Sequence, residues 1–234
     1  MAVYDLEEQE QIEDLKAWWA QYGKYVATVV TTVAVVVIAM QGWRWYQAGQ
    51  AEKASVLYQA VSQAAHVNNA AAAKDPATQL ATQFGGTAYA PRGVLLYAKL
   101  LYDAGDKGGA KAQLQWVIEH SSEEDLKAVA RFRLAQVLLD EKAYDDALRV
   151  LDVKIDDAFL ALFSDLKGDI LAAAGKGADA RDAYQTALAK LDPKSPYRPY
   201  LVAKLDALGG TAAPVPAPVG VPAPAAPAAP AAVK

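Results

Sequence analysis

The stretch YGKYVATVVTTVAVVVIAMQGWRWYQ, residues 22–47, decides how this chain is organised. Between Lys24 and Arg44 it holds 19 consecutive uncharged residues, which span roughly 28 Å as a helix, close to the hydrocarbon thickness of a bilayer. Many of these residues are β-branched and favour strands in soluble proteins, but strands rarely exceed about ten residues. In lipid, a single segment satisfies its own amides only as a helix. The stretch therefore predicts a transmembrane helix over residues 25–43.

Two other interpretations of this stretch are a cleaved signal peptide and a buried element of a soluble fold. A signal peptide has a short basic leader, whereas this run follows 24 residues with six acids and only two bases, Lys16 and Lys24. The bulky residues 43–46 are a poor context for cleavage, and aromatic side chains flank both ends of the run, as in membrane helices. We therefore favour a permanent anchor. The basic residues on its two sides balance, so charge does not orient it.

The composition of the rest of the chain argues against several functions. Residues 44–208 are nearly neutral, with 20 bases and 21 acids, which argues against a nucleic-acid-binding surface. The chain has no cysteine and only His66 and His120 as histidines, so we expect no metal site and no cofactor. Paired carboxylates such as Asp145-Asp146 lie beside turns and do not converge on a cleft, so we also expect no catalytic residues and no enzyme activity.

The two ends of the chain differ from its centre. Residues 209–234 hold seven of the twelve prolines, with many alanines, and are predicted to be a disordered Pro/Ala-rich tail. This tail is either a solvated spacer or a ligand for an aromatic groove elsewhere. Residues 1–24 form an amphipathic acidic segment with Ile12, Leu15, Trp19 and Tyr22 on one helical face. This segment is either an interfacial helix at the membrane edge or a plain solvated helix.

Residues 44–208 have helical spacing almost throughout, as in Ala54, Leu57, Tyr58 and Val61. Asp75-Pro76 resembles an N-cap followed by proline in the first turn, and Ser121 to Asp125 offers capping residues before another helix. The fold class is therefore predicted to be all-α.

Three stretches within this region superpose as internal repeats, at 91–122, 128–157 and 161–193. Each has a small residue followed twelve positions later by an alanine, as antiparallel helices in close contact require. The pairs are Ala98 and Ala110, Ala135 and Ala147, and Gly168 and Ala180. A turn lies between the helices of each pair, at residues 105–108, 140–142 and 175–177. The alternative is a set of helical hairpins whose alanine contacts coincide by chance.

The third unit resembles the tetratricopeptide repeat most closely, at Gly168, Leu171, Ala180, Tyr184 and Ala187, with Pro193 after it. The first two units lack the early tryptophan of that family, and Lys154 stands where a small residue is expected. The sequence thus predicts a tetratricopeptide-like helical-hairpin solenoid behind a single N-terminal transmembrane helix. The predicted segments are residues 1–24, 25–43, 44–208 and 209–234.

The order of these segments resembles the YfgM-like ancillary subunits of the bacterial SecYEG translocon. The resemblance is most specific in EEQEQIEDLKAWW, residues 7–19, with Tyr22-Gly23 and Gly42-Trp43. It implies a cell inner-membrane protein with a cytoplasmic N-terminus and a periplasmic repeat domain. It also implies the SecYEG translocon, exported polypeptides and a membrane-anchored periplasmic chaperone of the prolyl-isomerase class as partners. The alternative is a repeat scaffold of another inner-membrane assembly, in division or pilus formation. The Pro/Ala tail departs from the shorter family pattern.

Two contact surfaces are predicted. In the span, the small residues Ala27, Thr31 and Ala34 suit close packing against another membrane helix, although threonine can also bond to its own helix. In repeat arrays, the first helix of each pair usually lines a concave protein-binding groove. The residues predicted to face this groove are Arg92, Lys99, Tyr102, Phe132, Gln136, Leu139, Asp165 and Asp169. The alternative is that the apolar members belong to the core and the charged members to a solvated face.

Overall fold

The computed structural model describes residues 2–209, with side chains described for residues 12, 13 and 15–209. Every regular element in this range is an α-helix, which confirms the all-α prediction. The helices are α1 (Ala2–His66), α2 (Ala70–Gln83), α3 (Tyr89–Asp103), α4 (Lys107–His120), α5 (Glu124–Asp140), α6 (Tyr144–Leu151), α7 (Asp157–Ala173), α8 (Gly177–Lys190) and α9 (Arg198–Ala207). The Pro/Ala tail from residue 210 on, and the acidic side chains before Ile12, lie outside the described residues.

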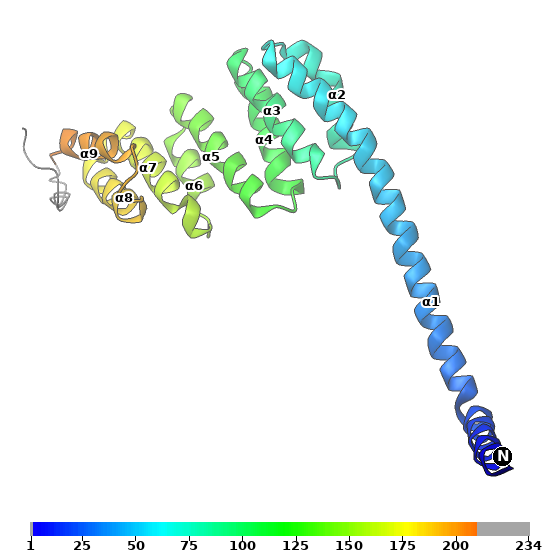
Figure 1. The fold of residues 1–234 in the computed structure, drawn as a ribbon. Helices are drawn as coiled ribbons and strands as arrows, with labels where there is room; N and C mark the ends of the chain where they lie inside the picture. Colours follow the sequence, from blue (N-terminus) through cyan, green and yellow to red (C-terminus); the bar gives the residue numbers. More distant parts are fainter. Residues whose placement is uncertain (1, 210–234) are drawn as a thin grey trace, which may run out of the picture. The chain divides into compact units, whose positions relative to one another are not determined.

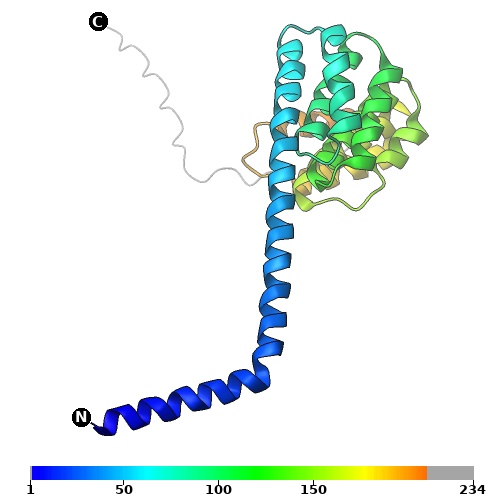
Figure 2. The ribbon, with the colours of Figure 1, turned by 90° about the vertical axis from the view of Figure 1, so that its right-hand side faces the viewer.

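Helix α1 joins the predicted span directly to the repeat region. It continues from Ala2 to His66, through the predicted boundaries after residues 24 and 43 (Figures 1 and 2). Its apolar part is long enough to cross a membrane. None of its most apolar 18-residue stretch is buried within the protein. The last turns instead pack into the repeat region through Ala54 and Val61, which are fully buried. The span of α1 is therefore exposed and apolar, whereas its last turns belong to the core of the repeat region.

Helix α2 begins earlier than the sequence predicted. Its N-cap is Asn69, whose side-chain oxygen accepts a hydrogen bond from the backbone N–H of Ala72 at 3.0 Å. The prediction of an N-cap at Asp75 is wrong, because the alanines after Asn69 are strong helix formers and the asparagine caps them first. Pro76 consequently lies inside the helix, where it cannot donate to the carbonyl of Ala72.

The predicted small residues of all three repeats are buried. Ala98, Ala110, Ala135, Ala147 and Ala180 are at most 1% exposed, and Gly168 is also buried. The predicted turns separate the expected helices. Asp106 caps α4 by accepting a hydrogen bond from Gly109 N–H at 2.8 Å, and Gly175 after α7 adopts a φ of +76°, which glycine allows without strain.

The chain forms two compact units, Met1–Val137 and Leu138–Lys234, and their boundary falls within α5. In the first unit, α1, α2 and α3 pack on one another, and α3 packs on α4 (Figure 1). Leu80 and Val61 are fully buried in this core, with Tyr97 and Leu100 beside them. Helices α2 and α3 approach so closely that a Cβ at Gly93 would lie 2.4 Å from Leu80 Cδ1.

In the second unit, α7 and α8 pair closely, α9 packs on α8, and α6 packs on α7. Leu201 and Leu205 of α9 are at most 1% exposed and lie in the same cluster as Tyr184 and Ala187 of α8. Burial of a leucine contributes roughly 1.5 to 3 kcal/mol. Helix α9 is therefore an integral part of this unit, although the sequence repeats end before it.

Candidate protein-binding surfaces

The predicted membrane-contact strip lies on the exposed surface of α1. Ala27, Thr31 and Ala34 are all exposed, and their spacing of three and four residues places them on one side of the helix. The neighbouring hydroxyl groups of Thr28 and Thr32 donate to the carbonyls of Lys24 and Thr28, each at 2.8 Å. Because small side chains let helix backbones approach closely, this strip can hold a second membrane helix.

In the first unit, the predicted basic residue Arg92 is already held by an intramolecular ion pair. Its guanidinium donates to both carboxylate oxygens of Glu123, at 2.7 and 2.8 Å, and to the carbonyl of Ala88 at 2.6 Å. The hydrogen bond with Glu123 raises the pKa of Arg92 and lowers that of Glu123. The pair ties α3 to the segment before α5, and about 40% of each side chain stays exposed.

The other groove residues of this unit differ in exposure. Lys99 is exposed and forms an ion pair with Asp103 one turn along α3. Tyr102 is 37% exposed, Gln136 is exposed and Phe132 is partly buried. A partner could therefore contact a lysine, a tyrosine ring and a glutamine here, with Phe132 contributing partly to the packing of the unit.

In the second unit, Leu139 is partly buried and Asp165 is only 7% exposed. The ammonium of Lys204 donates to Asp165 and to Asp169, each at 2.8 Å. Tyr197 donates its hydroxyl to Asp165, and Tyr184 donates to Asp169, both at 2.7 Å. The predicted acidic zone is therefore covered by α9 and its preceding turn, which corrects its expected open geometry. We call these five residues the Lys204 cluster.

The Lys204 cluster shifts the ionisation of its own members. Burial, followed by the hydrogen bond to Asp165, raises the pKa of Tyr197 to about 12. Burial and the bond to Asp169 raise the pKa of Tyr184 further. Burial alone would lower the pKa of Lys204, but its bonds to the two aspartates outweigh that effect and raise it. At neutral pH Lys204 is thus an ammonium and both tyrosines are neutral phenols.

One buried and one exposed tyrosine ring lie beside the Lys204 ammonium. The Lys204 ammonium lies 5.1 Å from the ring centre of Tyr200 and 5.5 Å from that of Tyr184, within the range of cation–π contacts. Tyr200 is 58% exposed, and its ring lies 5.3 Å from that of Tyr197. Helix α9 thus replaces the expected acidic surface with an aromatic one.

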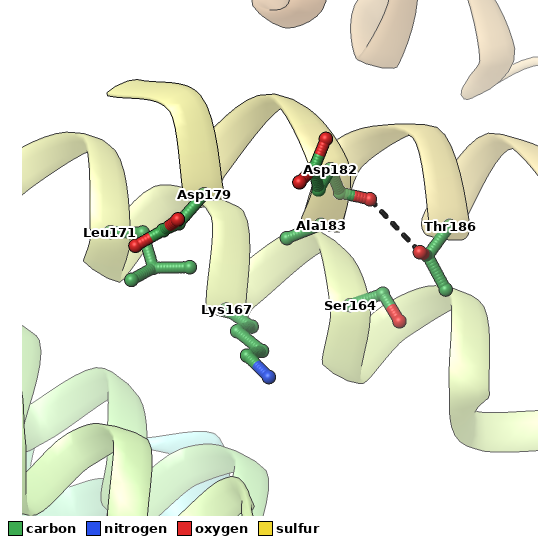
Figure 3. Close-up of a pocket in the computed structure, with 7 residues that line it drawn as sticks. All are labelled: Ser164, Lys167, Leu171, Asp179, Asp182, Ala183 and Thr186. Atoms are coloured by element: carbon green, nitrogen blue, oxygen red, sulfur yellow. Dashed lines mark hydrogen bonds between the residues drawn. The ribbon is translucent and has the colours of Figure 1, made fainter. Parts of the chain in front are cut away.

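A shallow hollow of about 400 Å³ lies between α7 and α8 (Figure 3). Ser164 and Lys167 line it from α7, and Asp179, Asp182 and Thr186 line it from α8. Thr186 donates its hydroxyl proton to the carbonyl of Asp182 at 2.9 Å, so this hydroxyl is directed into its own helix. The mixture of charges suits contacts with a polar polypeptide surface better than an apolar ligand.

Sequence reasoning missed the Lys204 cluster because its members come from α7, α8, α9 and the turn before α9. Lys204 lies 39 positions after Asp165 and 35 after Asp169. One available signal was the spacing of Leu201 and Leu205, which predicts that α9 packs by the face beside Lys204. The aromatic residues Tyr197 and Tyr200 were a second signal that this segment packs on the rest of the unit.

Comparisons with known proteins match most of the chain. Residues 16–210 match the family model described as tetratricopeptide repeat-like domain, which confirms the predicted repeats. A protein of Neisseria gonorrhoeae named "Ancillary SecYEG translocon subunit" is 30% identical over 210 residues, covering 87% of this chain and 98% of the relative. Relatives with the same name occur in Escherichia coli and Haemophilus influenzae. Both are 30% identical and cover 79% of this chain, with 88% and 90% of their own lengths matched.

Proposed function

The chain belongs to the family of ancillary SecYEG translocon subunits, and from that membership we propose that it is a membrane-anchored adaptor of the translocon. Its repeat domain binds exported polypeptides and links them to a membrane-anchored periplasmic chaperone of the prolyl-isomerase class. The observation that carries the proposal is the match to 98% of the length of the Neisseria relative, together with the family match over residues 16–210, which include both the span and the repeats.

The anchor supports a location beside the channel. The exposed apolar part of α1 crosses the cell inner membrane, with the N-terminus in the cytoplasm and the repeat domain in the periplasm. In that orientation the strip of Ala27, Thr31 and Ala34 faces a membrane helix of the translocon. Because α1 leads into the core of the first unit, the repeats stay close to the point where exported chains emerge.

The surfaces of the repeat domain support protein binding rather than catalysis. Tyr102 and Gln136 in the first unit, and Tyr200 in the second, expose aromatic and amide groups that suit extended polypeptide chains. The charged groups near them mostly take part in ion pairs, as in Arg92 with Glu123. We assign the exposed groove residues Lys99, Tyr102 and Gln136 to client or chaperone contacts and assign no catalytic step to the domain.

The proposal is tested by photo-crosslinking in cells. A photoreactive residue is placed at Ala34 in the span and, in separate variants, at Tyr102 and Gln136. Val36, which lies on the other side of α1, is the matched control for Ala34. We expect translocon subunits at Ala34 and not at Val36, with a chaperone or exported chains at Tyr102 and Gln136. Capture of an unrelated envelope complex at all three positions would overturn the translocon assignment.

A further inference from the structure

An aromatic hollow of about 370 Å³ lies where α1 passes the loop between α2 and α3, within the first unit. Its volume falls in the range of roughly 300 to 1,000 Å³ that small-molecule sites occupy. Trp43 and Tyr46 line it from α1, and Phe84 and Tyr89 line it from the other side. We call it the juxtamembrane pocket. None of the surfaces discussed above includes it.

The position of the juxtamembrane pocket relative to the membrane follows from helix geometry. Trp43 is the last residue of the uncharged run, and Ala51 at the far end of the pocket follows eight positions later. At about 1.5 Å per residue, the pocket extends roughly 12 Å beyond the end of the span. The headgroup layer of a bilayer is roughly 5 to 8 Å thick on each side. The part of the pocket nearest the span, around Trp43 and Tyr46, therefore lies at the depth of the phospholipid headgroups.

The wall opposite α1 is preformed. Phe84 and Tyr89 are partly buried against the core of the first unit, and the Tyr89 ring lies 5.8 Å from that of Tyr58. The loop between them is closed by Thr87, whose backbone N–H and hydroxyl both donate to the carbonyl of Phe84 at 2.8 Å. A site that exists before its ligand arrives loses little entropy of ordering on binding.

The lining carries polar groups but no charge. Gln47, Gln50 and Gln83 add amide groups to the aromatic rings, and Gln50 donates to the Tyr46 hydroxyl at 2.7 Å. Amide N–H groups can donate to a phosphate, while amide oxygens and aromatic faces can hold an ammonium. An uncharged lining leaves a net anion without a counter-charge, whereas a zwitterion brings its own.

From this depth, this lining and this preformed wall, we propose that the juxtamembrane pocket binds one zwitterionic phospholipid headgroup, of the phosphoethanolamine class. The glutamine amides hold the phosphate, and the rings of Trp43 and Tyr46, 5.9 Å apart, face the ammonium. The bound lipid fixes the first unit at the membrane surface. This inference requires only that α1 crosses the membrane and does not depend on the translocon as a partner.

The test uses the purified full-length chain in detergent, titrated with phosphatidylethanolamine and, separately, with phosphatidylglycerol, with bound lipid counted by native mass spectrometry. Trp45 lies at the same depth but outside the pocket lining, with 82% of its side chain exposed, so Trp45→Ala is the matched control for Trp43→Ala. Gln79→Ala in α2 is the control for Gln83→Ala in the same way, because both glutamines are exposed.

We expect the unaltered chain and both controls to hold one phosphatidylethanolamine. Trp43→Ala should raise its dissociation constant at least fivefold and Gln83→Ala about threefold, and phosphatidylglycerol should bind the unaltered chain at least fivefold more weakly. Equal losses in Trp43→Ala and Trp45→Ala, or equal binding of the two lipids, would overturn the proposal. Capture of polypeptide instead of lipid by a photoreactive residue at Gln47 in cells would also overturn it. None of these results depends on capture of the translocon at Ala34.

Discussion

The backbone of Gly168 lies directly against the ring of Tyr184, so that a Cβ at position 168 would lie 2.4 Å from Tyr184 Cε1 and 2.5 Å from Cδ1. Tyr184 is 3% exposed, and its hydroxyl is bound to Asp169. The ring therefore has little freedom to move. This contact sets the distance between α7 and α8, and its small partner is the residue that the repeat pattern requires.

We predict that Gly168→Ala destabilises the second unit. Overpacking a core costs about 1 to 3 kcal/mol, which outweighs the gain of about 1 kcal/mol in helix propensity. Hydrogen exchange of α7 and α8 in the full-length chain should become faster. Gly49→Ala in α1, where a Cβ would meet no atom within 4 Å, is the control and should leave stability unchanged or slightly higher. A stabilised Gly168→Ala variant would show that the Tyr184 ring is not held tightly against position 168.

The largely buried ion pair between Lys204 and Asp165 gives a second prediction. Lys204→Met leaves Asp165 buried without its cation, which costs about 3 kcal/mol in buried pairs of this kind. The midpoint of thermal unfolding should fall clearly. Lys99→Met removes a pair whose lysine side chain is 58% exposed, so its loss should stay below about 1 kcal/mol. Equal effects of the two variants would show that the Lys204 cluster contributes no more than a surface pair.

The phenols of this cluster predict a loss of stability at alkaline pH. The pKa of Tyr197 is raised from 10.0 to about 12 in the folded chain, first by burial and then by its bond to Asp165. Above pH 10 the unfolded chain releases this proton while the folded chain keeps it, so the free energy of unfolding falls as pH rises toward 12. Tyr184 and Lys204 act in the same direction.

The check is a series of denaturant titrations from pH 8 to pH 12 on the unaltered chain and on Tyr197→Phe. The variant has lost one of the groups responsible, so its stability should fall less steeply above pH 10. It should also be less stable by about 1 kcal/mol at neutral pH, because the bond to Asp165 is missing. Parallel curves above pH 10 would exclude Tyr197 as a contributor.

The membrane strip predicts that leucine has different effects on association at two positions of α1. Ala34→Leu places a large side chain where a partner helix would approach, whereas Val36→Leu enlarges a residue on the opposite side. We expect Ala34→Leu to reduce co-purification with the translocon roughly three- to tenfold, about 0.6 to 1.4 kcal/mol of association. Val36→Leu should leave it unchanged. Similar recoveries of translocon in both variants would remove the strip as a contact.

Local patterns in the sequence predicted most of the fold. The 19 uncharged residues identified the apolar part of α1, and the twelve-residue spacing identified the buried pairs, such as Ala98 and Ala110. The first signal is a run that is apolar on every side of the helix and long enough to cross a bilayer. The second arises because two antiparallel helices in close contact need small residues at corresponding positions. The repeat pattern also required a small residue at Gly168, where the structure shows the closest contact with Tyr184.

What the sequence did not predict depends on contacts between distant segments and on competition between neighbouring caps. Asp75 and Asn69 are both suitable N-cap residues, and the hydrogen bond that Asn69 accepts from Ala72 N–H shows that Asn69 is used. Likewise, periodicity indicates which side of α9 is buried, but not that Lys204 meets Asp165 and Asp169 there. The continuity of α1 to His66 was not predicted either, because the change in composition after residue 43 reflects a change of environment and not the end of a helix.

Because α1 is one continuous helix, it fixes the rotation of the first unit relative to the span. Since about 100° separates successive residues of an α-helix, the side of the span that meets a neighbour fixes the direction in which Ala54 and Val61 point. The number of residues between the span and these core positions therefore sets the direction in which the first unit faces around the membrane normal. Inserting one alanine at residue 48 would turn the unit by about 100° while raising it by only about 1.5 Å. Orientation would change far more than height, and with it the direction in which the surface around Tyr102 and Gln136 faces.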